Sequence, residues 1–169
     1  LPGIYKLTEG GSSSDNHVQS AFENTGHSYW FYYHFLNRDS YDSQGGVLKS
    51  SVHTTFQLQQ GQECSGDNAM FLAEPYWQMA YGEGGDLLKN PAGALDITAH
   101  ELTHAVTATE SKLKYENESG AINEALSDIF GSGAEAWMQS GGTASGNPSD
   151  GIKTKDNNWT TGEVSAQSD

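Results

Sequence analysis

Residues 96–104, DITAHELTH, combine two histidines and a carboxylate in a spacing that suits a metal ion. In a helix, residues four apart lie on one face, so His100 and His104 can bind the same cation. Neutral imidazole is a common zinc ligand, and Glu101 stands beside both rings as a candidate base for an activated water. The pattern H-E-x-x-H therefore predicts a zinc site that can carry out hydrolysis.

A second segment supplies a carboxylate that can serve as the third zinc ligand. Glu124 follows His104 in the chain and lies four residues before Asp128, so both acids share one helical face. One acid can bind the metal, while the other accepts a hydrogen bond from the second ring nitrogen of a ligating histidine. Paired histidines also occur as an ordinary polar helix face beside a core. The second acidic helix favours the metal site over that alternative.

Three helices are expected to carry these residues and to support them. Apolar residues recur at helical spacing in residues 17–37 and 120–139. Between them, Asn90 resembles a helix cap and Pro91 a first helical residue, with the helix running to about Ser111. This middle helix carries H-E-x-x-H, and the helix that follows it carries the two acids.

Three strands are expected in the first half of the chain. β-Branched and aromatic runs predict strands at residues 47–56, 70–72 and 76–81. Turns are predicted at the glycine-rich residues 42–46 and 82–86. Strands and helices together predict an α+β fold, and 169 residues suffice for a single domain with a modest core.

The composition is strongly acidic, with 8 Lys and Arg against 22 Asp and Glu and a formal net charge of −14. This charge disfavours nucleic acid and anionic membranes as partners, and it suits cation binding and solubility outside the cell. No run of about 18 apolar residues predicts a membrane-spanning helix, and no signal peptide is visible. The single cysteine, Cys64, is either an incidental surface thiol or the partner of a cysteine outside this sequence.

Several segments, in this order, resemble the thermolysin-like neutral metallopeptidases. They are NRDSYD (37–42), SSVH (50–53), MAYGEG (79–84), HELTHAVT (100–107) and YENESGAINEALSDIFG (115–131). The resemblance extends over most of residues 2–164. It implies a zincin-like N-terminal lobe, in which a small mixed or antiparallel sheet packs on an active-site helix beside a second helix with a zinc ligand.

The resemblance also implies a role for each matching residue of the zinc site. It makes His100, His104 and Glu124 the zinc ligands and Glu101 the general base that also shuttles the proton. Tyr115 matches a tyrosine that stabilises the tetrahedral intermediate. In the same way, Asp128 is expected to support His100, and Asn123 to support His104.

Substrate backbone is expected to pair with Asn68 and Ala69, which resemble the Asn-Ala pair of an edge strand in the family. An alternative alignment places Glu74 and Pro75 at these positions. We prefer Asn68 and Ala69, because a proline on a pairing edge would remove a hydrogen-bond donor.

The resemblance implies structural calcium as well, with Asp96, Glu135 and Glu163 at positions that match calcium ligands. Val164 replaces an acid expected in a double-calcium site, and fewer carboxylates offset less charge, so we expect one Ca²⁺. The alternative is that these acids are ordinary surface charges of helices.

The implied function is zinc-dependent endopeptidase activity on peptide or protein substrates, in a secreted enzyme. Residues 1–169 are expected to form part of the catalytic domain, without the helical C-terminal lobe of the same enzyme. That lobe completes the cleft and supplies a further histidine, so we expect the isolated chain to be weak or inactive. The alternatives are a zinc- and calcium-binding domain without catalysis and, less in keeping with the Glu124 helix, a different zinc hydrolase.

Overall fold

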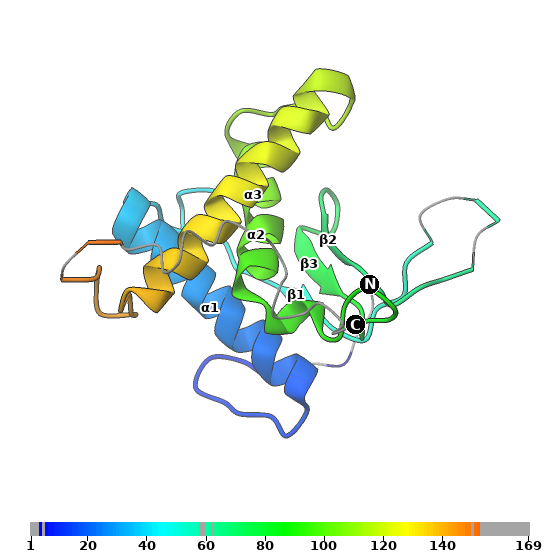
Figure 1. The fold of residues 1–169 in the computed structure, drawn as a ribbon, viewed down its shortest axis with the longest axis horizontal. Helices are drawn as coiled ribbons and strands as arrows, with labels where there is room; N and C mark the ends of the chain where they lie inside the picture. Colours follow the sequence, from blue (N-terminus) through cyan, green and yellow to red (C-terminus); the bar gives the residue numbers. More distant parts are fainter. Residues whose placement is uncertain (1–3, 5, 58–59, 62, 150, 153–169) are drawn as a thin grey trace.

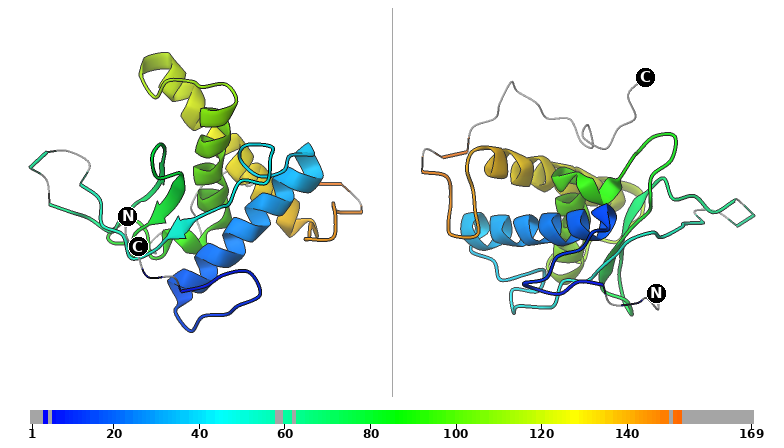
Figure 2. Two further views of the ribbon diagram at one scale, coloured as in Figure 1. Left: turned by 180° about the vertical axis from the view of Figure 1, so that it is seen from behind. Right: turned by 90° about the horizontal axis from the view of Figure 1, so that it is seen from below.

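The computed structural model describes residues 4, 6–57, 60–61, 63–149 and 151–152. Within them, three helices combine with a three-stranded sheet: α1 (Asn16–Leu36), β1 (Ser50–Ser51), β2 (Ala69–Leu72), β3 (Gln78–Tyr81), α2 (Leu95–Thr109) and α3 (Asn117–Gln139). A 3-10 turn, η1 (Pro91–Gly93), precedes α2. Helix α2 contacts both other helices and also β2 and β3 (Figures 1 and 2). The predicted α+β architecture is confirmed.

Helix α1 begins and ends with polar caps that its sequence supplies. The carboxylate of Asp15 accepts hydrogen bonds from the backbone N–H groups of His17 and Val18, at 3.0 and 3.3 Å. These bonds satisfy donors that have no partner inside the helix. At the other end Asn37 adopts a left-handed conformation with φ 51°, which stops the helix. The predicted helix at 17–37 is therefore present, shifted by one residue.

The first strand is much shorter than predicted, because β1 holds only Ser50 and Ser51 of the expected residues 47–56. The strand ends at a turn where His53 has a φ of 55°, a left-handed conformation that no regular strand adopts. Beyond this turn Phe56 pairs with Ser65 in an isolated bridge instead of continuing the sheet.

The sheet is mixed, with β3 in the centre. Strand β1 pairs with β3 in parallel, and β2 pairs with β3 antiparallel, with Met70 opposite Ala80. The predicted strand at 76–81 begins at Gln78, because a turn that includes Trp77, with φ 46°, precedes it. Strand β2 has β3 as its only partner among the described strands, so no strand of the described part of the chain pairs with its other edge.

The prediction that Asn90 caps the H-E-x-x-H helix is wrong. The helix α2 starts at Leu95, because the 3-10 turn η1 comes first and Ala94 after it is extended. The side chain of Asn24 on α1 donates to the carbonyl of Ala92 at 2.8 Å and holds this turn against the first helix. A contact with a distant segment thus helps to hold the turn that precedes α2.

The third helix, α3, starts at Asn117, three residues before the predicted start at 120. Its side chain Trp137 is fully buried and joins the core, which also draws on α1, α2 and β3. That core includes Phe31, Tyr32, Met79, Tyr81, Leu102 and Ala105. Within the described residues, no helix combines the length and apolar character that crossing a membrane requires.

Candidate metal centre

Three side chains from two helices converge at one point of the structure. One ring nitrogen each of His100 and His104, on α2, and a carboxylate oxygen of Glu124, on α3, lie within 4.8 Å of one another. The carboxylate oxygens of Glu124 lie 3.3 Å from His100 Nε2 and 3.5 Å from His104 Nε2. Ligands bound to tetrahedral zinc at about 2.0–2.1 Å are separated by about 3.3–3.4 Å. The spacing of these atoms therefore suits a zinc ion.

The other ring nitrogens determine which atoms the histidines present. His100 Nδ1 lies 2.8 Å from Asp128 Oδ1, and His104 Nδ1 lies 2.8 Å from Asn123 Oδ1. Both oxygens are acceptors, so each Nδ1 carries a proton and each neutral ring presents its Nε2 lone pair. The two Nε2 atoms are 3.0 Å apart, and their lone pairs repel unless a cation or a proton lies between them.

Burial helps to keep one of these rings in the form that binds metals. Removal of His104 from water lowers its pKa, because the charged imidazolium loses hydration, although the hydrogen bond to Asn123 opposes this effect. A neutral ring is the state in which a histidine can donate a lone pair to zinc. Two oriented imidazoles and one carboxylate thus form a donor set that fits Zn²⁺.

Glu101 lies on the same helix but faces the sheet side of the site. Its side chain is buried, with 7% exposed, and this burial raises its pKa to about 8. The charge of Glu124 adds to the rise, whereas the backbone N–H of Phe71 on β2 opposes it. A cation among the neighbouring ligands would favour the carboxylate form. Glu101 is therefore a buried carboxyl group beside the candidate metal ligands, which is the position that a general base at this site would need.

Tyr115 comes from the loop before α3 and reaches the same site. Its hydroxyl donates a hydrogen bond to Glu124, and its ring centroid lies 5.9 Å from that of His104. The bond to the carboxylate raises the pKa of Tyr115 to about 12, so the hydroxyl keeps its proton. Tyr115 is consequently a hydrogen-bond donor beside the candidate metal ligands.

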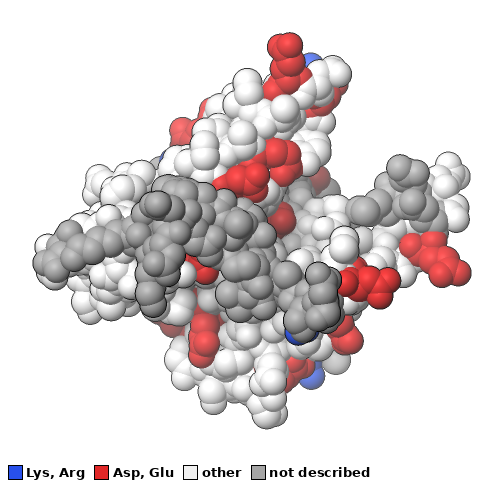
Figure 3. Space-filling view, in the orientation of Figure 1, with Lys and Arg blue, Asp and Glu red and all other residues white. Residues whose placement is uncertain are grey.

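A cleft opens beside these residues, between α2 and the start of β2. It is lined by Asn68, Ala69, Leu88, Ile97, His100, Glu101 and Asp128. Asn68 precedes the edge strand and Ala69 begins it, whereas Glu74 and Pro75 lie in the turn between β2 and β3. On the face of the protein shown in Figure 3, Asp and Glu side chains outnumber Lys and Arg. The cleft thus lies beside the start of β2 and next to Glu101.

Ser127 also belongs to this site, although sequence reasoning did not single it out. Its side chain is fully buried on α3, and its hydroxyl lies 3.2 Å from His104 Nδ1. Helical spacing could have identified it from the sequence, because Ser127 follows Asn123 by one turn and therefore faces the same partner helix.

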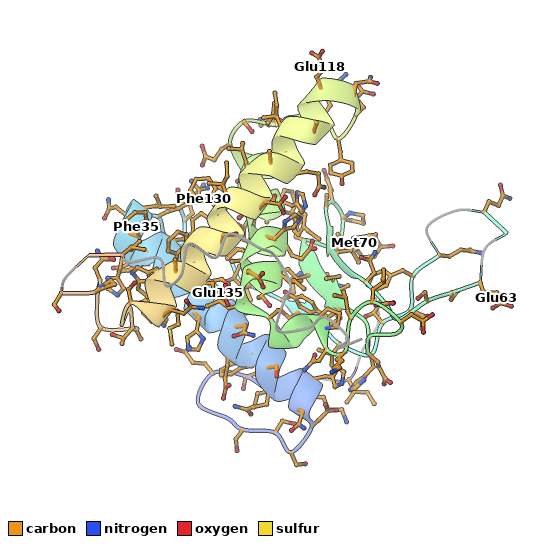
Figure 4. All side chains as sticks on the ribbon, viewed as in Figure 1. Phe35, Glu63, Met70, Glu118, Phe130 and Glu135 are labelled. Carbon is orange, nitrogen blue, oxygen red and sulfur yellow. The ribbon has the colours of Figure 1, made fainter. Side chains whose placement is uncertain are left out.

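The candidate calcium residues lie farther along the two helices. Asp96, in the first turn of α2, is buried with 2% exposed, and its Oδ1 accepts from the backbone N–H of Ile97 at 2.8 Å. Glu135, which Figure 4 labels, lies on α3 one turn beyond Gly131. A β-carbon added at Gly131 would lie 2.6 Å from the carbonyl oxygen of Asp96. Glu163 lies outside the described residues. The structure therefore brings two candidate ligands to one end of the helix pair.

Comparison with sequence models of known protein families shows to which family this chain belongs. Residues 7–108 match the thermolysin metallopeptidase catalytic domain, which is more than half of the chain. The chain belongs to the thermolysin metallopeptidase family. A second match, to the alpha-helical domain of thermolysin metallopeptidases, covers residues 111–169. The two histidines therefore lie in the segment matched to one domain of this family and Glu124 in the segment matched to the other.

Individual members of the family are similar over most of this chain. Bacillolysin from Bacillus amyloliquefaciens is 40% identical over 121 residues, which are 71% of this chain and 21% of that protein. An extracellular metalloprotease from Pectobacterium carotovorum subsp. carotovorum is 39% identical over 78% of this chain and 35% of its own length. The solved structure of the precursor of protealysin, a metalloproteinase from Serratia proteamaculans, has a TM-score of 0.69 at 35% identity. It covers 82% of this chain and 40% of that one.

Replacement of Asp128 by Ala should weaken zinc binding without removing a ligand. We expect about a 10–100-fold loss of affinity, because His100 loses the carboxylate that orients its ring. Competition with a chelator measures the affinity. Glu118→Ala is the matched control, because Glu118 is an exposed acid at the far end of α3 (Figure 4) and its loss removes the same charge. An equal effect of both substitutions would mean that Asp128 acts only through its charge.

Proposed function

We propose that this protein is a zinc-dependent endopeptidase. The observation that carries the proposal is the convergence of His100, His104 and Glu124 at one point. A buried carboxylate, Glu101, lies beside them on α2, the helix that carries the two histidines. Three protein ligands leave a position open, as in catalytic zinc sites. Family membership supports the same activity, although the relatives are longer than this chain.

The proposed mechanism gives each of these residues a role. When bound, Zn²⁺ supplies Lewis-acid chemistry that acidifies a water and polarises the scissile carbonyl. Glu101 accepts the proton of the attacking water and later donates it to the leaving amine. The hydroxyl of Tyr115 donates a hydrogen bond to the oxyanion. Asp128 and Asn123 hold the two imidazoles in the required orientation.

Peptide is proposed to bind as an extended strand at the edge of β2. Asn68 and Ala69 line the cleft next to Glu101, and the outer edge of β2 is not paired with another described strand, which suits the addition of a peptide strand. The geometry therefore favours Asn68 and Ala69 over Glu74 and Pro75, which lie in the turn between the strands.

Calcium is proposed as a structural ion at Asp96 and Glu135, with Glu163 as a further ligand. Support comes from the burial of Asp96 on α2, where this helix meets α3. Glu135 lies on α3. Carboxylates are the ligands that Ca²⁺ prefers. Secretion is proposed as well, because a relative 39% identical over 134 residues is an extracellular metalloprotease.

Hydrolysis of a quenched fluorescent peptide tests the proposed activity. We expect cleavage that stops after zinc is removed with a chelator and returns when zinc is added back, because the residues at the site need the metal to activate water. The same assay shows whether the isolated 169-residue chain is weak, as expected from the sequence. Suppose instead that the protein binds zinc tightly but cleaves no peptide, and that a longer form of the protein does not cleave peptide either. This result would support a non-catalytic zinc- and calcium-binding domain.

A further inference from the structure

The distance between α2 and α3 is as important to the metal centre as the ligands themselves, because His100 and His104 lie on one helix and Glu124 on the other. The two helices run antiparallel at this crossing. Asp96, at the start of α2, lies against Gly131, and His104, two turns later, lies against Asn123. Each contact between the helices therefore helps to determine where Glu124 stands.

The two helices approach each other closely at Gly131. A β-carbon at this position would lie 2.6 Å from the carbonyl oxygen of Asp96 and 3.5 Å from the β-carbon of His100. The nearer atom is helix backbone, which cannot rotate away as a side chain can. Any residue larger than glycine must therefore move the helices apart, by about 0.5–1 Å if a normal contact is to be restored.

We propose that Gly131 is a positioning residue for the metal centre: its missing side chain sets the helix separation that brings Glu124 to His100 and His104. The inference rests on the proposed zinc site. Asp128, one turn before Gly131, bonds His100 at 2.8 Å, so a shift at the crossing reaches this hydrogen bond first. Functional groups must stay within about 0.5 Å of their working positions, which is comparable to the shift that a methyl group imposes.

The test compares two Gly→Ala substitutions on the same helix. Gly131→Ala adds a methyl group at the crossing, whereas a β-carbon at Gly133 meets, among the described residues, only Phe31, at an ordinary 3.5 Å. Both changes favour the helix to the same degree. We expect Gly131→Ala to lower zinc affinity by about 10–100-fold, the range seen when the support of metal ligands is disturbed. Gly133→Ala should bind zinc as the original protein does.

Two further measurements separate positioning from folding. Far-ultraviolet circular dichroism and thermal unfolding without metal report the fold of each variant. The absorption spectrum of bound Co²⁺ reports the ligand geometry, and we expect it to change in Gly131→Ala but not in Gly133→Ala. Ser127→Thr is a second probe, because it keeps the hydroxyl near His104 and adds one methyl group to a fully buried side chain of the same interface.

The outcomes are distinct. Reduced zinc affinity with an altered Co²⁺ spectrum in a folded Gly131→Ala protein supports the proposal, and where Gly131→Ala does not fold, the same result in a folded Ser127→Thr protein supports it. Unchanged affinity in a folded Gly131→Ala protein overturns it. Failure of both probes to fold, while Gly133→Ala folds, also overturns it, because the crossing would then serve the fold and not the site. If the original protein itself binds no zinc, it is the proposed function that fails.

Discussion

In an active, complete form of the enzyme, replacement of Glu101 by Gln is expected to remove most peptidase activity while zinc stays bound. Glutamine has the shape of glutamate but cannot accept the proton of the attacking water. Loss of a general base costs about 10²–10⁴ in rate. Because Glu101 is buried and is not one of the three converging ligands, its replacement should leave the metal site in place. Peptide hydrolysis and metal analysis of the purified variant measure the two properties separately.

The matched control for this substitution is Glu118→Gln, which makes the same chemical change on an exposed side chain that does not line the cleft. It should leave both activity and zinc content as they are. Two outcomes would contradict the role of Glu101. In the first, the Glu101→Gln protein turns over substrate at a near-normal rate. In the second, its activity is lost together with its zinc, which would make Glu101 a support of the metal site.

Replacement of His104 by Ala is expected to weaken zinc binding by more than about 100-fold. This loss is larger than the one expected for Asp128→Ala, which removes only a residue that orients a ligand. The remaining His100 and Glu124 supply two ligands, and the site then lacks the third that zinc sites of this kind use. Zinc that binds only the folded protein stabilises it by about 4 kcal/mol when present at 1,000 times its dissociation constant. The original protein should therefore unfold at a higher temperature with zinc, whereas the variant should respond little.

His27→Ala serves as the control, because His27 lies on α1 and takes no part in the converging group. Its unfolding temperature should rise with zinc as that of the original protein does. A zinc response of the His104→Ala protein equal to that of the original would show that the ion binds elsewhere, and the assignment of the three ligands would have to be abandoned.

Interactions between residues close in the chain were predictable. The spacing of His100 and His104 and that of Glu124 and Asp128 placed each pair on one helical face, because the helix repeat alone determines which side chains are neighbours. The strands at 70–72 and 76–81 were found from local composition, with errors at their ends. Membership of the thermolysin metallopeptidase family was also visible in the order of the segments.

Interactions between distant segments were decided only by the tertiary structure. His53 ends β1 in a left-handed turn, and the contact between Asn24 and Ala92 holds the turn from which α2 starts. The role of Gly131 could not be inferred from spacing, because a glycine within a helix has no visible purpose until the facing backbone is known. Local periodicity determines which face a side chain occupies, but packing between helices determines how closely two faces approach. The sequence thus identified the candidate ligands, and the α2–α3 crossing placed them within reach of a single ion.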